Sequence, residues 1–363
     1  MKSRLILIID LSLSFILGLL LILSSYGGNI DPREWVLPSF VVMMFPLFLI
    51  LMIILFIVNI YVSRLCAGIN LLCLLICGNA ILFFCPINFG HNDNDKNCFK
   101  LLTYNVFQLH DFSNPETTDP ENPTLKFLLN SGSDIIALQE CYSLNYIKDG
   151  QKPSKELIDS ICKIYPYTDF SPEAIGLLSI YPFKKIEQKY HPDYSFQTNS
   201  YQIFIGSDTL TLINVHLQSI GLSKSDKELY MQLTEGQTEE KGLKGELKDI
   251  KNDLFSKLSV AFKKRANQID KICEMTDEIE GKVIVCGDFN DVTLSYACTA
   301  LLKHGFKDAY RQAGRGPAIT YHDNRFYFRI DHVFYRGSLT ADYATVKKNP
   351  SSDHYPVLVD FQI

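Results

Sequence analysis

Residues 283–290 read Val-Ile-Val-Cys-Gly-Asp-Phe-Asn, an apolar run that ends in a loop with one carboxylate and one amide. A second loop of this kind, Ser-Asp-His-Tyr-Pro at 352–356, comes just before an apolar run near the C-terminus. Asp288 and Asn290 are two residues apart and should lie on one side of a strand end, and His354 places a proton-transfer group beside the hard metal ligand Asp353. Together the two loops predict a metal-assisted phosphoester hydrolase.

Further strand-like runs on either side of these loops end in, or carry, polar residues. We expect strands at 99–106, 134–139, 175–180, 201–205, 210–215, 283–286, 328–335 and 357–361. Asn105 lies near the end of the first run, Glu140 follows the second, and His216 follows the fifth, which forms a predicted hairpin with the fourth. This strand-rich order with interspersed helices predicts two sheets packed face to face with helices outside them.

The first 89 residues are dominated by apolar side chains. They contain three apolar stretches, at about Leu5–Tyr26, Trp35–Val62 and Leu65–Phe89. Each is long enough to cross about 30 Å of hydrocarbon as a helix. Lys2 and Arg4 precede the first stretch as in a signal peptide, but no small-x-small cleavage site follows it and two more apolar stretches do. Asp10, inside the first stretch, either reaches the headgroups or pairs with another polar group in the helix bundle.

The positive charges predict the orientation of these spans. Lys2 and Arg4 flank the first stretch and Arg64 lies between the second and third, whereas the loop at 27–34 has no positive excess. Cytoplasmic ends at the basic residues place residues 90–363 on the exoplasmic, or periplasmic, side after three spans. The chain is therefore predicted to be a multi-pass membrane protein.

The predicted organisation is a three-helix transmembrane region at 1–90, a linker at 91–98 and a catalytic domain at 99–363. A Lys- and Glu-rich segment without proline, at about 221–280, has helical apolar spacing and predicts a partly exposed helical excursion. The basic run 263–265 within it is interpreted as a solvated helix surface, with a phosphate or lipid-headgroup patch as the alternative.

Charge and cysteine content exclude some classes of protein. The net charge is −5, and the first 89 residues hold four basic and three acidic residues, so the remainder is the acidic part. Such a domain is not suited to tight nonspecific nucleic-acid binding, although a local basic groove remains compatible with it. Of the ten cysteines, four lie in the third apolar stretch, and the others are scattered without a CxxC pair. A zinc site is therefore not predicted.

Six segments, in order and with matching spacing, resemble the endonuclease/exonuclease/phosphatase superfamily. They are Thr-Tyr-Asn-Val at 103–106, Leu-Gln-Glu at 138–140, Asn-Val-His-Leu at 214–217, Gly-Asp-Phe-Asn at 287–290, Arg-Ile-Asp-His at 329–332 and Ser-Asp-His-Tyr-Pro at 352–356. With three apolar stretches in front, the chain is similar to membrane-attached bacterial members. The resemblance implies an α/β fold, a four-layer α/β sandwich of two packed mixed sheets flanked by helices, here preceded by an all-α transmembrane segment of three helices.

The resemblance also implies a metal centre. Asn105 and Glu140 would bind the metal, with Asp353 in or near its coordination sphere, and these hard oxygen ligands suit Mg²⁺, with Mn²⁺ as an alternative. By the same resemblance, Asp288 would orient or deprotonate the attacking water, and Asn290 would hold the scissile phosphate.

Two histidines would flank that phosphate. His354, paired with Asp331, would be a cation that stabilises the transition state, and His216 would donate a second hydrogen bond to the substrate. The catalytic set implied is thus His216, Asp288, Asn290, Asp331 and His354. His332 should point to the opposite face of its strand and is left out. A carboxylate partner for His216 is not identifiable, and Glu173 is a weak candidate.

The resulting expectation is a membrane-anchored, Mg²⁺-dependent, nuclease-like phosphodiesterase that uses in-line attack of water. Its substrate would be a phosphodiester or phosphomonoester in a nucleic acid or a lipid headgroup, and no obligate protein partner is inferred. The alternatives are a phospholipid or inositol-phosphate phosphoesterase of the sphingomyelinase type and a catalytically inactive membrane-bound binding module. Family members often carry a basic residue where Ile180 stands here, which weakens inferences about substrate contacts at that point.

Overall fold

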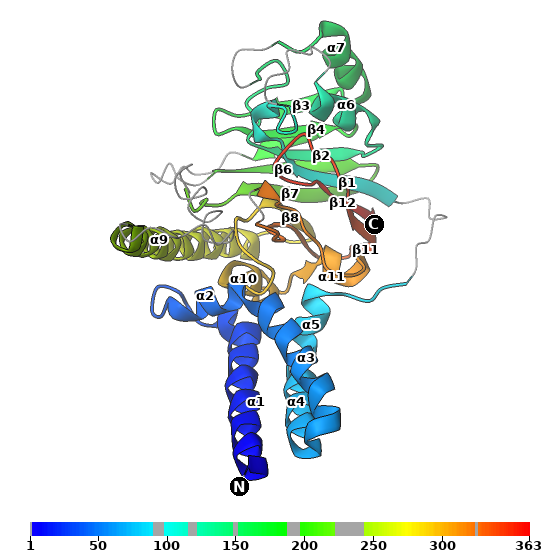
Figure 1. The fold of residues 1–363 in the computed structure, drawn as a ribbon. Helices are drawn as coiled ribbons and strands as arrows, with labels where there is room; N and C mark the ends of the chain where they lie inside the picture. Colours follow the sequence, from blue (N-terminus) through cyan, green and yellow to red (C-terminus); the bar gives the residue numbers. More distant parts are fainter. Residues whose placement is uncertain are drawn as a thin grey trace.

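The structure is a computed structural model that describes residues 2–89, 98–114, 122–147, 152–186, 197–221, 243–323 and 326–363. In the helices that begin at residues 2 and 243, side chains are described from residues 7 and 254 onward. The predicted linker lies almost entirely outside the described residues. An N-terminal helix bundle stands below a two-sheet domain (Figure 1).

The N-terminal bundle consists of six helical segments. They are α1 (Lys2–Tyr26), the 3₁₀ helix η1 (Gly27–Asn29), α2 (Leu37–Met43), α3 (Phe45–Val62), α4 (Arg64–Ile76) and α5 (Gly78–Phe84). Two helices, Leu7–Asn29 and Phe45–Val62, are long and apolar enough to cross a membrane, and α4 with α5 counts as a third only if the pair is one span bent by 61°. The prediction of three spans is thus reduced to two or three.

Two local features divide the longer apolar stretches. Pro46 has no amide hydrogen and is tolerated only in the first turn of a helix, so the second stretch breaks at Met44 between α2 and α3. The third stretch bends where Cys77 meets Gly78. Apolar composition does not reveal either break.

A polar contact holds the bundle at its end far from the sheets. Asn59, 1% exposed, donates a hydrogen bond from Nδ2 to Asp10 Oδ1 at 3.0 Å, and Ser14 Oγ lies 3.5 Å from the same nitrogen. Of the two readings of Asp10, pairing within the bundle is therefore confirmed. Such a bond between α1 and α3 fixes their register in surroundings that offer few other partners.

The soluble domain consists of two six-stranded mixed sheets, as predicted. The first has the order β11-β12-β1-β2-β4-β3 and the second the order β5-β6-β7-β8-β10-β9. The strands are β1 (Cys98–Asn105), β2 (Ile135–Gln139), β3 (Tyr167–Phe170), β4 (Ile175–Ser179), β5 (Phe183–Ile186), β6 (Gln197–Ile205), β7 (Asp208–His216), β8 (Lys282–Asp288), β9 (Lys307–Asp308), β10 (Asp331–Arg336), β11 (Thr340–Val346) and β12 (Val357–Gln362). The pairs β1–β2 and β7–β8 are parallel.

The two sheets pack through a buried apolar core, with side chains such as Phe99, Tyr201 and Phe361 between them. The remaining helices are η2 (Phe107–Leu109), α6 (Pro123–Asn130), α7 (Lys155–Ile164), α9 (Leu243–Asp277), α10 (Tyr296–Lys303) and α11 (Ala309–Ala313). Helices α6 and α7 cover the outer face of the first sheet, whereas α9 and α10 cover the second (Figure 1). This layering is the predicted four-layer sandwich.

The helix bundle packs against α9 and α10, the helices that cover the outer face of the second sheet. Leu21 and Met52 of the bundle belong to the same buried apolar cluster as Val283 and Phe289 of the sheet region. Arg33, in the loop before α2, bonds to Asp270 of α9 at 2.5 Å. The soluble domain therefore shares a continuous core with the apolar helices.

Two predictions about local structure need correction. The strand predicted at 328–335 begins only at Asp331, because Phe328 instead pairs with Tyr321 in an isolated bridge. Within the basic run of α9, Lys263 and Lys264 are exposed, but Arg265 is 1% exposed. Arg265 points toward the sheet because residue 265 lies on the side of α9 that faces the sheet.

Candidate active site

The ends of four strands bring the predicted polar residues together. Strands β1 and β2 run in parallel and finish at Asn105 and Gln139, and β7 and β8 run in parallel and finish at His216 and Asp288. Parallel strands end at the same edge of a sheet, and the two sheets face each other there. One side of the sandwich thus collects carboxylates, amides and imidazoles from distant parts of the chain.

Unusual backbone conformations occur at this edge. Glu140 and Asn290 have φ values of 54° and 52°, a region that residues other than glycine rarely adopt. Gly287 has a φ of 139°, and a Cβ there would lie 1.9 Å from the carbonyl oxygen of Val215, so only glycine fits between the parallel strands. Strained residues of this kind cluster at functional sites.

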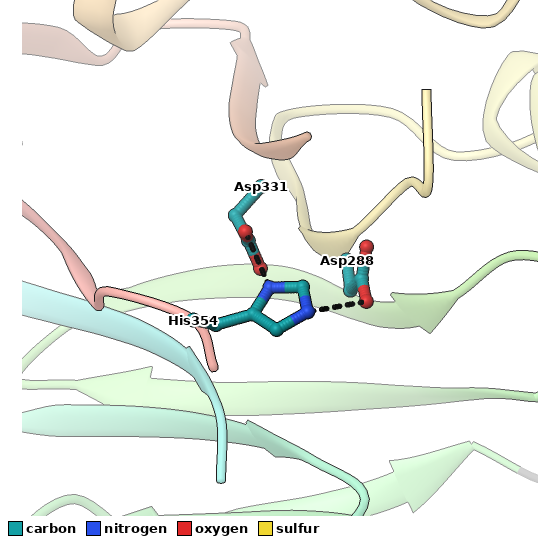
Figure 2. Close-up of side chains that lie close together, drawn as sticks. All are labelled: Asp288, Asp331 and His354. Carbon is teal, nitrogen blue, oxygen red and sulfur yellow. Dashed lines mark hydrogen bonds and ion pairs between the residues drawn. The ribbon is translucent and has the colours of Figure 1, made fainter. Parts of the chain in front are cut away.

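His354 lies between two buried aspartates (Figure 2). Its Nδ1 is 2.8 Å from Asp331 Oδ2, and its Nε2 is 3.6 Å from Asp288 Oδ2. Burial disfavours the charged imidazole, but the attraction of Asp331 and Asp288 outweighs burial and raises the pKa of His354 well above its ordinary value. The site therefore holds an imidazolium at neutral pH.

His216 approaches the same carboxylate from the neighbouring strand β7, where it lies directly beside Asp288. Its Nε2 lies 3.6 Å from Asp288 Oδ2 and 3.9 Å from Glu140 Oε1. Its Nδ1 is 2.7 Å from Gln197 Oε1, and Gln197 is directly opposite His216 in the β6–β7 ladder. The glutamine oxygen can accept only a proton carried on Nδ1, so it orients the ring with Nε2 toward the carboxylates.

Asn105 connects the two carboxylates at the centre of the site. Its Nδ2 donates to Glu140 Oε1 at 3.2 Å and to Asp288 Oδ2 at 3.0 Å, and its Oδ1 accepts from the Phe107 amide at 3.1 Å. Glu140, Asp288 and the Asn105 amide thus form a compact set of hard donors of the kind that Mg²⁺ prefers. Rotation of the Asn105 side-chain amide by 180° would exchange Oδ1 and Nδ2 and place Oδ1 beside the two carboxylates.

Among the described residues, one group of acidic and histidine side chains meets the geometry of a metal site. It consists of Asp288, Asp331 and His354, with ligand atoms within 4.8 Å of one another. The imidazole of His354, however, fills the space between the two carboxylates and is hydrogen-bonded to Asp331. The Asp288, Asp331 and His354 side chains are therefore better suited to an ion pair than to a metal ion. The region around Glu140 and Asn105 is better suited to a metal cation.

The two other predicted residues lie close by. Asp353 is 8% exposed, and its neighbour Ser352 donates to the Asn105 carbonyl at 2.8 Å, which holds the loop against β1. Asn290 donates from Nδ2 to the Leu217 carbonyl at 3.1 Å, so one amide hydrogen is committed to the protein and one is left for a ligand. His332 points away from the site, as predicted, with Nε2 at 3.0 Å from the Asp291 carbonyl.

Gln197 and Arg265 were missed by the sequence-based interpretation. Gln197 takes the place considered for Glu173, and it would have been found if the predicted strand at 201–205 had begun four residues earlier. Arg265 donates to the Asp291 carboxylate at 3.1 Å and to the Gln218 carbonyl at 3.0 Å. It thereby joins the loop after His216 to the loop after Asn290, and no sequence signal distinguished it from its exposed neighbours.

Two family profiles match different parts of the chain. The profile of the Endonuclease/Exonuclease/phosphatase family matches residues 102–354, and a domain of unknown function matches residues 3–84. No curated protein matches the chain at a significant level.

Among solved structures, an endonuclease/exonuclease/phosphatase from Beutenbergia cavernae is 14% identical, with a TM-score of 0.49 and coverage of 74% of this chain and 72% of that one. A family protein from Leptotrichia buccalis is 17% identical (TM-score 0.48, coverage 73% and 100%). TDP2 from C. elegans is also 17% identical, with a TM-score of 0.45 and coverage of 84% and 83%.

Proposed function

Because the chain belongs to the Endonuclease/Exonuclease/phosphatase family, we propose that it is a membrane-anchored phosphodiesterase that depends on Mg²⁺ or Mn²⁺. The observation that carries the proposal is the His354–Asp331 pair at 2.8 Å facing Asp288, next to Asn105 and Glu140. Phosphoester hydrolysis needs a cation, a base and oxygen ligands for a metal ion near one point. Here these are His354, Asp288, and Asn105 with Glu140.

Each residue has a distinct part in this proposal. Asp288 orients the attacking water and accepts its proton, and its buried carboxylate accepts a hydrogen bond from the Asn290 backbone N–H at 2.8 Å. His354 donates a hydrogen bond to a phosphoryl oxygen from one side, and His216 does so from the other when both of its ring nitrogens carry protons. The free hydrogen of the Asn290 side-chain amide adds a third bond. Asp331 orients His354 and keeps it charged.

Glu140, Asn105 and Asp353 would hold the metal ion. When bound, a divalent cation neutralises the charge that develops on the phosphate oxygens. Asp288 also accepts a hydrogen bond from the Asn105 side-chain amide, so the proposed base is bonded directly to a proposed metal ligand.

We expect Glu140→Gln to raise the Mg²⁺ concentration needed for half-maximal activity and to reduce activity at limiting Mg²⁺ by about 10²-fold or more, because the change removes a ligand charge and keeps the shape. Mg²⁺ titrations of the purified full chain, with EDTA as the blank, measure both quantities. Unchanged activity at limiting Mg²⁺ would contradict the ligand assignment.

We expect Gln197→Leu to lower kcat by roughly 10- to 100-fold with little change in KM, because His216 loses the acceptor that orients it. Gln197→Glu keeps an acceptor oxygen and should retain more activity. In a His216→Ala background the leucine change should have no further effect. An equal loss with and without His216 would mean that Gln197 acts only on the fold.

The substrate is tested by hydrolysis of DNA, RNA, sphingomyelin and inositol phosphates by the full chain in detergent, with Mg²⁺ or EDTA. A phospholipid substrate is the second candidate, favoured by the core that the apolar helices share with the β7–β8 sheet. Absent turnover on all four, with intact metal binding, would support an inactive binding module, whereas turnover that persists in EDTA would contradict the proposed metal dependence.

The soluble domain is proposed to be exoplasmic. Protease added to intact spheroplasts should then cleave the domain that follows residue 98 and leave a membrane-protected N-terminal fragment. Immunoblotting with tags at either end measures this. Protection of the domain until the cells are lysed would place it in the cytoplasm.

A further inference from the structure

A cavity of about 370 Å³ lies beside the catalytic residues and has no part in the mechanism above. Four of its lining residues are aromatic, and one is a lysine. Its lining includes Tyr310, His322, Tyr327, Val346, Lys348 and Tyr355. This volume is within the range of small-molecule sites and is large enough for a heterocyclic ring with its attached group.

The walls of this cavity present flat rings. His322 and Tyr355 are stacked, with their centroids 4.0 Å apart and their planes 21° from parallel. His322 Nε2 donates a hydrogen bond to the Ser352 carbonyl oxygen at 2.9 Å, which fixes the orientation of the ring. Tyr327 is 59% exposed, a large exposed aromatic surface at the edge of the cavity.

The cavity is next to the catalytic centre in the chain and in space. Tyr355 directly follows His354, and the ring of Tyr321, which precedes His322, lies 5.0 Å from the His354 ring. A row of rings also leads back toward the proposed metal side, because Phe112 lies 5.8 Å from both His322 and Phe107. The Phe107 amide in turn bonds to Asn105.

The charge at the cavity favours an anionic ligand. Lys348 lines it and its neighbour Lys347 is also exposed, in a chain whose net charge is −5. A quaternary ammonium headgroup, which aromatic rings can also bind, would be repelled by these two lysines. An acyl chain carries no charge for Lys348 to contact.

We propose that this cavity binds a nucleobase of the substrate while the ester's phosphate lies between His354 and His216. The proposal rests on the phosphodiesterase function proposed above and narrows its substrate to nucleotides or nucleic acids. Stacking on aromatic side chains suits a base of any sequence and typically contributes roughly 5- to 150-fold in affinity. Lys348 is placed to contact an anionic part of the same ligand, such as an adjoining phosphate.

The test is equilibrium binding of AMP, ribose phosphate and phosphocholine to the full chain in detergent with EDTA, so that no turnover is required. AMP should bind at least about 5-fold more tightly than the two ligands that lack a base. Tyr327→Ala should weaken AMP binding by about 10-fold and leave ribose phosphate binding unchanged. Tyr167→Ala, at another exposed tyrosine (41%) on β3, is the matched control and should change neither.

A second variant keeps the test independent of the tyrosine. Lys348→Met should weaken AMP binding while preserving the preference for AMP over ribose phosphate. Equal affinity for AMP and ribose phosphate, a preference for phosphocholine, or AMP binding that is insensitive to Tyr327→Ala would each overturn the proposal. AMP binding with these sensitivities in a chain that hydrolyses no phosphodiester would leave the cavity assignment standing and reject the proposed activity.

Discussion

Asp288→Asn is expected to lower kcat by about 10³-fold while the protein stays folded. The carboxylate is 1% exposed, accepts from Asn105 at 3.0 Å, and lies 3.6 Å from Nε2 of both His216 and His354. Asparagine keeps the size of the side chain but cannot take the proton of the attacking water. Removing the charge also withdraws one of the two carboxylates that favour the charged His354.

The measurement is kcat on a phosphodiester at saturating Mg²⁺, with the unfolding temperature recorded for each variant. Asp159→Asn, at an exposed aspartate on α7, is the matched control and should keep full activity. Turnover within a few-fold of the wild type would exclude Asp288 as the base. A loss of activity that tracks a loss of folded protein would assign it a structural role only.

The clustering of the candidate site residues could be predicted because strand ends fix their positions. Asn105, Glu140, His216 and Asp288 each terminate or follow an apolar run of strand length. Parallel pairing of these runs places their ends together whatever the loops between them contain. The local sequence therefore carried most of the information about this edge of the fold.

Contacts made across the fold were not predictable in the same way. Helical periodicity shows which face of α9 is apolar, but it does not show that Arg265 joins the Asp291 carboxylate to the Gln218 carbonyl. Gln197 is a polar residue at a strand end, and its bond to His216 depends on the register of the hairpin. The aromatic cavity likewise forms from segments that are separate in the chain.

The shared core between the helix bundle and the second sheet has a consequence for the site. Phe289, between Asp288 and Asn290, belongs to the same apolar cluster as Leu21 and Met52 of the bundle. At Gly28, a Cβ would lie 2.1 Å from the Leu294 carbonyl oxygen, so η1, which follows α1, is in close contact with the loop that follows Asn290. The helix bundle therefore supports the loop that carries Asp288 and Asn290.

Asp331→Asn should lower kcat by about 10²-fold and move the alkaline limb of the pH–activity profile toward neutral pH, with Mg²⁺ affinity nearly unchanged. Burial opposes the charge on His354, and Asp331 is the strongest of the groups that raise its pKa. In the wild type the imidazolium persists well above pH 6.5. Without Asp331 its pKa falls, so the cation that stabilises the transition state is lost at lower pH.

The same pair predicts how stability depends on pH. A group whose pKa is raised on folding stabilises the native state fully below its unfolded value, about 6.5 for histidine, and this contribution disappears as pH rises through the folded value. The difference in unfolding temperature between the wild type and Asp331→Asn should therefore be largest between about pH 5 and 6.5 and shrink at alkaline pH. If the variant instead loses Mg²⁺ binding while its pH profile is unmoved, Asp331 is a metal ligand and the division of roles between Asp331 and Glu140 is wrong.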